Sequence, residues 1–298
     1  MSLPPTNGLE SENPPPFSNP DGPAPPPPRA PRRVPNLGHA FLFVSFAGIL
    51  LLAFMVVLAI MGKSPAVPHG GAVTIPHPML QIAMMATVYL TTLLVAWLFF
   101  PLLWHRPFLD GLQWHWSIAR DQANRLITLG FALGVMMAIL TAFISSPKNL
   151  PLDQFFATPA TAWVITLFGT FAAPVFEEIC FRGFLFPAFA IAYDWVALPR
   201  TPEARTRWQT TTTLTPASLI FSAILTSFLF AAMHAEQDAH LWAALVGLFS
   251  ISLILTFVRV KTQSVAASAL VHSAYNGFIF LMTIFATGGY RHLDRMLH

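Results

Sequence analysis

Long apolar blocks separated by short polar stretches organise the chain. Each block is long enough to cross a bilayer, which takes about 20 residues in a helix. The blocks span residues 37–62, 79–104, 126–145, 159–192, 216–235, 240–258 and 264–286. The fourth block exceeds one ordinary crossing and contains Pro174, Gly183 and Pro187, where a helix can kink or break. The pattern predicts an all-α fold, a polytopic transmembrane helical bundle with seven or eight membrane helices and an intramembrane polar cavity.

Composition supports a membrane protein and excludes several other classes. Hydrophobic residues make up 55% of the chain and charged residues 10%, with a mean hydropathy of +0.60. The formal net charge is +3, but the basic residues lie mostly in loops, where they set membrane topology, so no nucleic-acid partner is implied. Cys180 is the single cysteine, which excludes an intramolecular disulfide. We expect no cleavable signal peptide, because no short apolar stretch with a small-residue cleavage site begins the chain.

Residues 1–36 differ from the rest of the chain. They are rich in proline and contain almost no large apolar residues, so they cannot bury enough surface to offset the entropy of ordering. We interpret them as a disordered, proline-rich cytoplasmic tail. Residues 37–290 form the expected integral membrane domain, with the polar motifs within 159–280.

The distribution of basic residues predicts the orientation. On a seven-crossing count, one side holds eleven: Arg29, Arg32, Arg33, Arg106, Arg120, Arg125, Arg200, Arg205, Arg207, Arg259 and Lys261. The other side holds four: Lys63, Lys148, Arg291 and Arg295. Because cytoplasmic loops carry the excess of Lys and Arg, the N-terminus is predicted to be cytoplasmic. We interpret the compact, single-cysteine chain as a multi-pass protein of a bacterial plasma membrane.

Two connections on the predicted cytoplasmic side are longer than simple turns between helices. Residues 106–125 mix Trp114 and Trp116 with charged residues, which is typical of an interfacial amphipathic segment with a tryptophan anchor. Residues 193–216 form a long connection between the fourth and fifth blocks.

Two adjacent carboxylates and an arginine interrupt the fourth apolar block. A charge at the centre of a membrane helix costs about 2.5 to 3.5 kcal/mol on insertion scales, so this group requires a reason. Glu178 and Arg182 are four positions apart and can pair across one helical turn. Glu177 points roughly 100° away around the helix and has no local partner. The pattern singles out Glu177 as the candidate reactive group and favours a structural role for the pair.

Later blocks carry further polar residues at helical spacing. Phe230 precedes His234 by one turn, and His272 precedes Asn276 by one turn. At 1.5 Å per residue from the basic residues 259–261, His272 lies about 16 Å deep, inside the hydrocarbon. Taken singly, such residues more often bond to a neighbouring helix than catalyse a reaction. Since His234 ends its block while the glutamates lie mid-block, their cooperation would require the fourth block to be bent or partly re-entrant.

Together these groups could hydrolyse a carbonyl compound with an activated water. A carboxylate in a low-dielectric site can act as general base, and an imidazole beside it can orient the water. A histidine and an asparagine on one face can stabilise a developing oxyanion. The alternative assembly is a zinc site made of Glu177, His234 and His272, because one carboxylate and two histidines are a common catalytic set. These three lack the local spacing that marks zinc sites, so a mechanism without a cofactor is preferred.

Three motifs follow one another on successive apolar blocks: Glu177-Glu178-x-x-x-Arg182-Gly183, Phe230-x-x-x-His234 and His272-x-x-x-Asn276. In this order they resemble the CAAX-protease and bacteriocin-processing family of intramembrane endopeptidases. This family includes the type II CAAX prenyl endopeptidases and the Abi proteins. The resemblance covers about residues 159–280.

The resemblance implies a helical bundle whose catalytic cavity opens toward the cytoplasm and the membrane. Its catalytic residues would be Glu177, His234, His272 and Asn276, supported by Glu178, Arg182 and Phe230. Glu177 would activate water together with His234, and His272 with Asn276 would form the oxyanion site. Members are commonly called metalloproteases, although a glutamate-and-water mechanism needs no metal. The implied partner is a membrane-anchored or lipidated peptide or protein, including a prenylated CAAX-type substrate, in the lipid bilayer.

Two other functional classes compete with the protease. A non-catalytic membrane immunity or scaffold factor would use the same polar cluster to lock its helices. An ion-coupled transporter would also need buried glutamate and histidine, but such transporters often contain internal repeats, and the glutamate segment is not repeated here.

Overall fold

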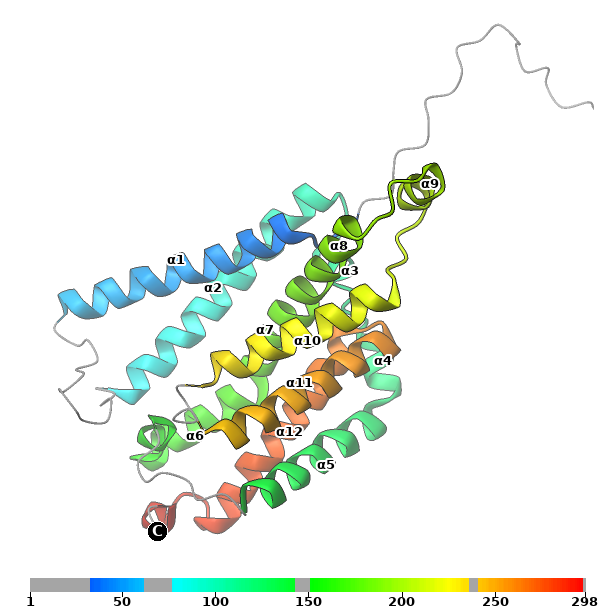
Figure 1. Ribbon diagram of the computed structural model, residues 1–298. Helices are drawn as coiled ribbons and strands as arrows, with labels where there is room; N and C mark the ends of the chain where they lie inside the picture. Colours follow the sequence, from blue (N-terminus) through cyan, green and yellow to red (C-terminus); the bar gives the residue numbers. More distant parts are fainter. Residues whose placement is uncertain (1–32, 62–76, 143–150, 236–240, 297–298) are drawn as a thin grey trace, which may run out of the picture.

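The computed structural model describes residues 33–61, 77–142, 151–235 and 241–296, and all regular elements in these ranges are helical (Figure 1). Seven helical segments are long and apolar enough to cross a membrane. They are α1 (Leu37–Ile60), α2 (Pro78–Trp104), α5 (Ala123–Ala142), the composite segment Pro159–Val196, α10 (Pro216–Met233), α11 (Trp242–Thr262) and α12 (Val265–Ala286). The predicted all-α multi-pass membrane protein is confirmed.

Shorter helices connect these crossings: α3 (Phe108–Leu112), α4 (Trp116–Asp121), η1 (Pro151–Phe156), α9 (Pro202–Thr210) and η4 (Leu293–Met296). The predicted amphipathic segment therefore consists of α3 and α4, and the long connection after the fourth crossing contains α9. Most of the predicted tail, residues 1–32, lies outside the described residues.

The fourth candidate crossing is one helical stretch of 38 residues, so the described chain has seven candidate crossings rather than eight. Its parts are α6 (Pro159–Leu167), η2 (Phe168–Ala172), α7 (Ala173–Glu178), η3 (Ile179–Leu185) and α8 (Phe186–Val196). Both η2 and η3 are π-helical, so each hydrogen bond there reaches five residues back instead of four. Pro174 lies within this stretch without dividing it into two spans.

The fourth and fifth crossings form a hairpin whose register is set at its closed end. The backbone N–H of Thr215 donates to Asp194 Oδ2 at 3.0 Å, and the Thr215 hydroxyl donates to Oδ1. Glu177 lies 17 positions before Asp194, and His234 lies 19 positions after Thr215. At 1.5 Å per residue these paths are about 26 and 28 Å long, so both residues reach a similar depth. A re-entrant fourth block is therefore not required for the two residues to share a depth.

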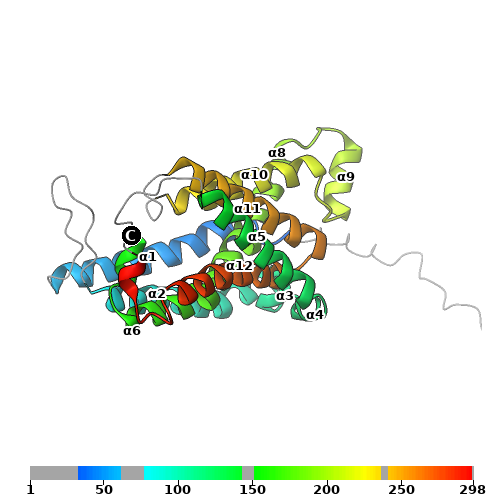
Figure 2. The same ribbon diagram turned by 90° about the horizontal axis from the view of Figure 1, so that it is seen from below.

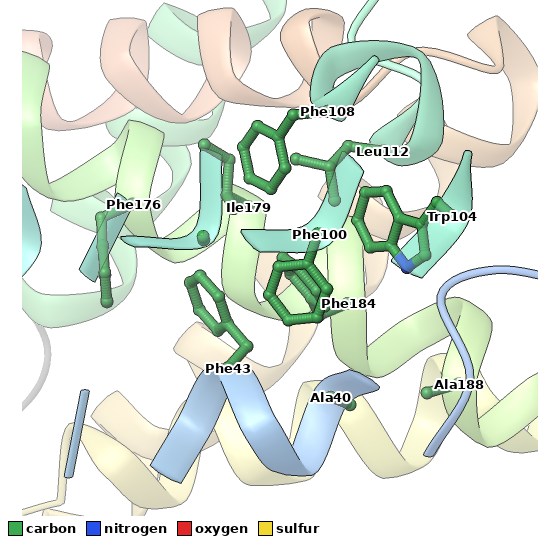
Figure 3. Close-up of a cluster of buried hydrophobic side chains, with 11 residues drawn as sticks. Ala40, Phe43, Phe100, Trp104, Phe108, Leu112, Phe176, Ile179, Phe184 and Ala188 are labelled. Carbon is green, nitrogen blue, oxygen red and sulfur yellow. The ribbon is translucent and has the colours of Figure 1, made fainter. Parts of the chain in front are cut away.

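An aromatic cluster supports one face of the fourth crossing (Figure 3). The ring of Phe184 stacks on Phe43 of α1 with centroids 4.3 Å apart and lies 4.9 Å from Phe100 of α2. Trp104 stacks on Phe100 at 4.9 Å. These large rings bury the side of the fourth crossing that faces α1 and α2, so the polar residues are positioned by a fully packed neighbourhood.

The other side of the fourth crossing contacts α12, which is packed in turn against α5 (Figures 1 and 2). At Gly130, α5 closely approaches the backbone of α12. A Cβ atom there would lie 2.5 Å from both the Val271 carbonyl oxygen and the Ala274 Cβ. Only glycine allows this contact, which fixes α12 next to the position of His272.

Candidate functional site

The Glu178–Arg182 pair is fully buried inside the fourth crossing. Arg182 Nη1 donates to Glu178 Oε1 at 2.8 Å, and the two side chains are 1% and 0% exposed. Arg182 Nη2 donates to both the carbonyl oxygen and the hydroxyl of Ser252 in α11, at 2.9 and 2.8 Å. The predicted pair is therefore confirmed, and it also ties the fourth crossing to α11.

His272 of α12 lies between the two carboxylates. Its Nδ1 is 3.0 Å from Glu178 Oε1, and its Nε2 is 3.8 Å from Glu177 Oε2. The first distance is a hydrogen bond and the second is long enough for a closer approach or a bridging group. Residues predicted from two of the three motifs thus form one cluster, which consists of Glu177, Glu178, Arg182 and His272.

Glu177 is the accessible carboxylate of the cluster. Its side chain is 12% exposed, whereas that of Glu178 is completely buried. The residue before it, Phe176, stacks on Tyr89 of α2 with ring centroids 3.9 Å apart and planes at 5°. This stacking fixes the backbone that carries Glu177. Of the two glutamates, only Glu177 can meet an incoming water or substrate.

Phe230 packs against the cluster, as its motif position suggested. Its ring lies 5.2 Å from Phe181, 5.7 Å from His272, and 5.1 Å from the guanidinium carbon of Arg182. The His234 ring lies 4.6 Å from Phe230, and its Nδ1 bonds to the Phe230 carbonyl oxygen at 2.8 Å. In the described residues His234 forms no hydrogen bond with either glutamate, and its ring packs against Phe230.

Asn276 is placed one turn beyond His272 but engages a different partner. Its Nδ2 donates to the carbonyl oxygen of Gly169 at 2.7 Å. Pro174 lies five positions after Gly169 and has no N–H, so it cannot supply the π-helical hydrogen bond to that carbonyl. The Asn276 amide substitutes for the missing donor. One of its two amide hydrogens is used in this way and the second remains for another acceptor.

The proposed zinc ligands do not form a compact set. Among the described residues, no group of three or more His, Cys, Asp or Glu side chains is arranged to hold a metal ion. His272 Nε2 lies 3.8 Å from Glu177 Oε2, and the bond of His234 Nδ1 to its own helix leaves Nε2 as the nitrogen that would face such a site. The residues as placed do not fit the metal, so no step is derived through it.

Some contributors to the site were missed by sequence reasoning. Ser252 anchors Arg182, and Gly169 accepts from Asn276, yet both are small residues in apolar segments and belong to none of the three motifs. Tyr89 supports Phe176 from a helix without a family motif. The absence of a donor at Pro174 was a usable signal, because a proline inside a helix leaves a carbonyl that requires another partner.

These features define a multi-pass helical membrane protein with a buried site of two carboxylates, a guanidinium and an imidazole. The family described as type II CAAX prenyl endopeptidase Rce1-like matches residues 159–278. Residues 159–278 are therefore similar to an Rce1-like domain, which is the family that the motifs predicted. Comparisons with curated proteins and with solved structures gave no match.

Proposed function

We propose that this protein is an intramembrane endopeptidase that hydrolyses a peptide bond of a membrane-anchored or lipidated substrate. The observation that carries the proposal is the position of His272 between two buried carboxylates within a protease-family domain. The family supports proteolysis in general. The lipidated substrate, with a prenylated C-terminal cysteine as the first choice, is part of the proposal.

Glu177 is the proposed general base. Its carboxylate takes a proton from a water molecule while the water oxygen bonds to the carbonyl carbon of the substrate. The proton then passes to the amide nitrogen, the C–N bond breaks, and a carboxylate and an amine leave. The partial exposure of Glu177 supports this role over Glu178, which is buried and bonded to Arg182.

His272 and Asn276 are the proposed stabilisers of the oxyanion. His272 bonds through Nδ1 to Glu178, and its Nε2 lies on the Glu177 side, where it would donate to the substrate oxyanion. The second amide hydrogen of Asn276 would supply another donor.

Glu178 and Arg182 hold His272 in place through the hydrogen bonds that link α12, the fourth crossing and α11. Phe230 is the proposed support for this arrangement. The proposed role of His234 is to orient the water through Nε2, because Nδ1 is bonded to the Phe230 carbonyl.

The test is cleavage of quenched-fluorescence peptides, with and without a farnesylated C-terminal cysteine, by the detergent-solubilised full chain. Glu177→Gln is nearly isosteric but cannot accept the proton, so we expect cleavage to fall by about 10² to 10⁴-fold. Glu203→Gln in α9, an exposed position, is the matched control and should cleave like wild type. Elution profile and thermal unfolding verify that both variants fold.

Three outcomes decide between mechanisms. A Glu177→Gln protein as active as wild type would remove the proposed base. Activity that is lost with a chelator and restored by zinc would replace the metal-free mechanism by a metal site. If wild type cleaves neither the peptides nor its native membrane substrate, the endopeptidase proposal is overturned.

The competing proposal is a non-catalytic membrane factor, and one observation favours it. The polar side chains of Arg182 and Asn276 bond to backbone carbonyls of other helical segments, as residues that lock helices together would. Under this alternative, Glu177→Gln retains the biological effect of the protein.

A further inference from the structure

A basic pocket lies at the end of the bundle where α1, α8 and α10 meet, apart from the carboxylate cluster. Its volume is about 530 Å³, and none of Glu177, Glu178, Arg182, His272 or Asn276 lines it. Residues from five segments of the chain form its wall, including the start of the described chain, α3, and the ends of α8, α10 and α11. The pocket is therefore a product of the assembled bundle.

Among the residues that the structure describes, three arginines and no acidic residue line this pocket. They are Arg33, Arg106 and Arg259. The remaining polar positions of the wall are glutamine and threonine side chains, such as Gln113, which carry no charge. The described wall therefore has a strong excess of positive charge.

Arg259 provides the decisive observation. This residue is 5% exposed, its Nη2 donates to the neutral Gln113 side chain, and its Nε is buried without a hydrogen-bond partner in the described residues. In the same part of the chain it forms no ion pair with an acid. A buried, uncompensated guanidinium is costly, and an anion in the pocket would relieve that cost.

The other two arginines complete a cationic wall. Arg33 stacks on Trp208 with its guanidinium carbon 3.6 Å from the ring centre and donates to the backbone of Trp208 and Thr211. These contacts fix its position, while Asp194 interacts with its charge. Arg106 is exposed at the pocket. The pocket thus combines two positioned guanidinium groups with one accessible from solvent.

We propose that this pocket binds the headgroup of an anionic phospholipid. Guanidinium groups match phosphate geometry, and basic pockets between membrane helices are suited to lipid headgroups. The wall also contains Phe186, Ile191 and Leu219, which offer apolar contact to the glycerol and upper acyl region. A lipid therefore satisfies both parts of the wall, and this proposal does not depend on proteolysis.

The experiment uses the full chain in nanodiscs of phosphatidylcholine alone or mixed with phosphatidylglycerol. We expect phosphatidylglycerol to raise the unfolding temperature and to stay bound in native mass spectrometry. Arg259→Gln should weaken the apparent affinity about tenfold or more, because a charge-assisted hydrogen bond is removed. Arg106→Gln, at an exposed position, should also weaken the apparent affinity for phosphatidylglycerol. This variant serves as the test if Arg259→Gln fails to fold.

Arg120→Gln is the matched control, since Arg120 is an exposed arginine paired with Asp121 outside the pocket. It should retain the lipid response. Inorganic phosphate and a short peptide with a free C-terminal carboxylate are added separately to the phosphatidylcholine sample. An Arg106-dependent response to the peptide but not to phosphatidylglycerol would overturn the proposal of a lipid ligand and would favour a peptide carboxylate as the ligand. Loss of the response in Arg120→Gln, or no response to phosphatidylglycerol, would overturn the proposal that this pocket binds the lipid headgroup.

Discussion

At the scale of single residues, the polar groups of the site each satisfy a specific structural need. The i,i+4 spacing of Glu178 and Arg182 made their pairing predictable. The contact of Asn276 with Gly169 was not, because it depends on the π-helical register of η2 and on the missing N–H of Pro174. Sequence motifs identify which side chains matter, while the backbone of a neighbouring helix decides what they bond to.

The link between Asn276 and Pro174 can be tested by a double-mutant cycle. Asn276→Leu leaves the Gly169 carbonyl without its donor and should lower the free energy of unfolding by about 1 to 3 kcal/mol. Adding Pro174→Ala supplies an N–H for the local helix and should recover part of that loss. Chemical unfolding of the four proteins measures the coupling.

Asn124→Leu, at an exposed position in the first turn of α5, is the control for the polarity change. Strictly additive effects of the Asn276 and Pro174 substitutions would contradict the proposed carbonyl link. Recovery of stability in the double variant without recovery of cleavage would support a separate chemical role of the Asn276 amide.

At the scale of helices, close contact between α5 and α12 fixes the position of His272. The apolar blocks predicted both helices, but their mutual distance depends on Gly130, which the sequence does not distinguish from other helical glycines. A Cβ atom at Gly48 in α1 would meet nothing within 4 Å, whereas one at Gly130 would meet the backbone of α12. The same residue type therefore has opposite significance in the two helices.

This difference predicts opposite effects of one substitution. Gly130→Ala should destabilise the protein by about 1 to 3 kcal/mol through overpacking and reduce any Glu177-dependent cleavage. Gly48→Ala should be neutral or stabilising by about 0.5 to 1 kcal/mol, because alanine favours the helix. Thermal unfolding and peptide cleavage measure both effects. A Gly130→Ala protein with unchanged unfolding and cleavage would contradict the role assigned to this contact.

At the scale of the whole molecule, the hydrophobic pattern alone was sufficient to predict seven or eight membrane crossings. It was not sufficient to predict their arrangement, because a lipid-facing and a protein-facing apolar surface look alike in sequence. The apparent mismatch in depth between Glu177 and His234 arose because the positions of residues within apolar blocks do not show how neighbouring helices are aligned. It disappears only once the Asp194–Thr215 contact sets the register of the two helices.

Seven crossings and the excess of basic residues at one end predict opposite locations for the two termini. Green fluorescent protein fused before residue 1 should fluoresce in a bacterial host, and alkaline phosphatase fused after residue 298 should be active. Phosphatase fused instead after residue 110, on the side of the N-terminus, should be inactive. The reverse pattern of activities would show the opposite orientation.

The hydrogen bonds between Asp194 and Thr215 also have a consequence for how the chain can vary. They join the fourth and fifth crossings at the closed end of their hairpin. The distance from this point to Glu177 or His234 therefore depends only on the number of residues within each helix. Residues 195–214 lie outside that count. This connection can lengthen or shorten without shifting Glu177 relative to Phe230. One residue inserted into the fourth crossing or into α10 would instead rotate the functional residue on that helix by about 100°.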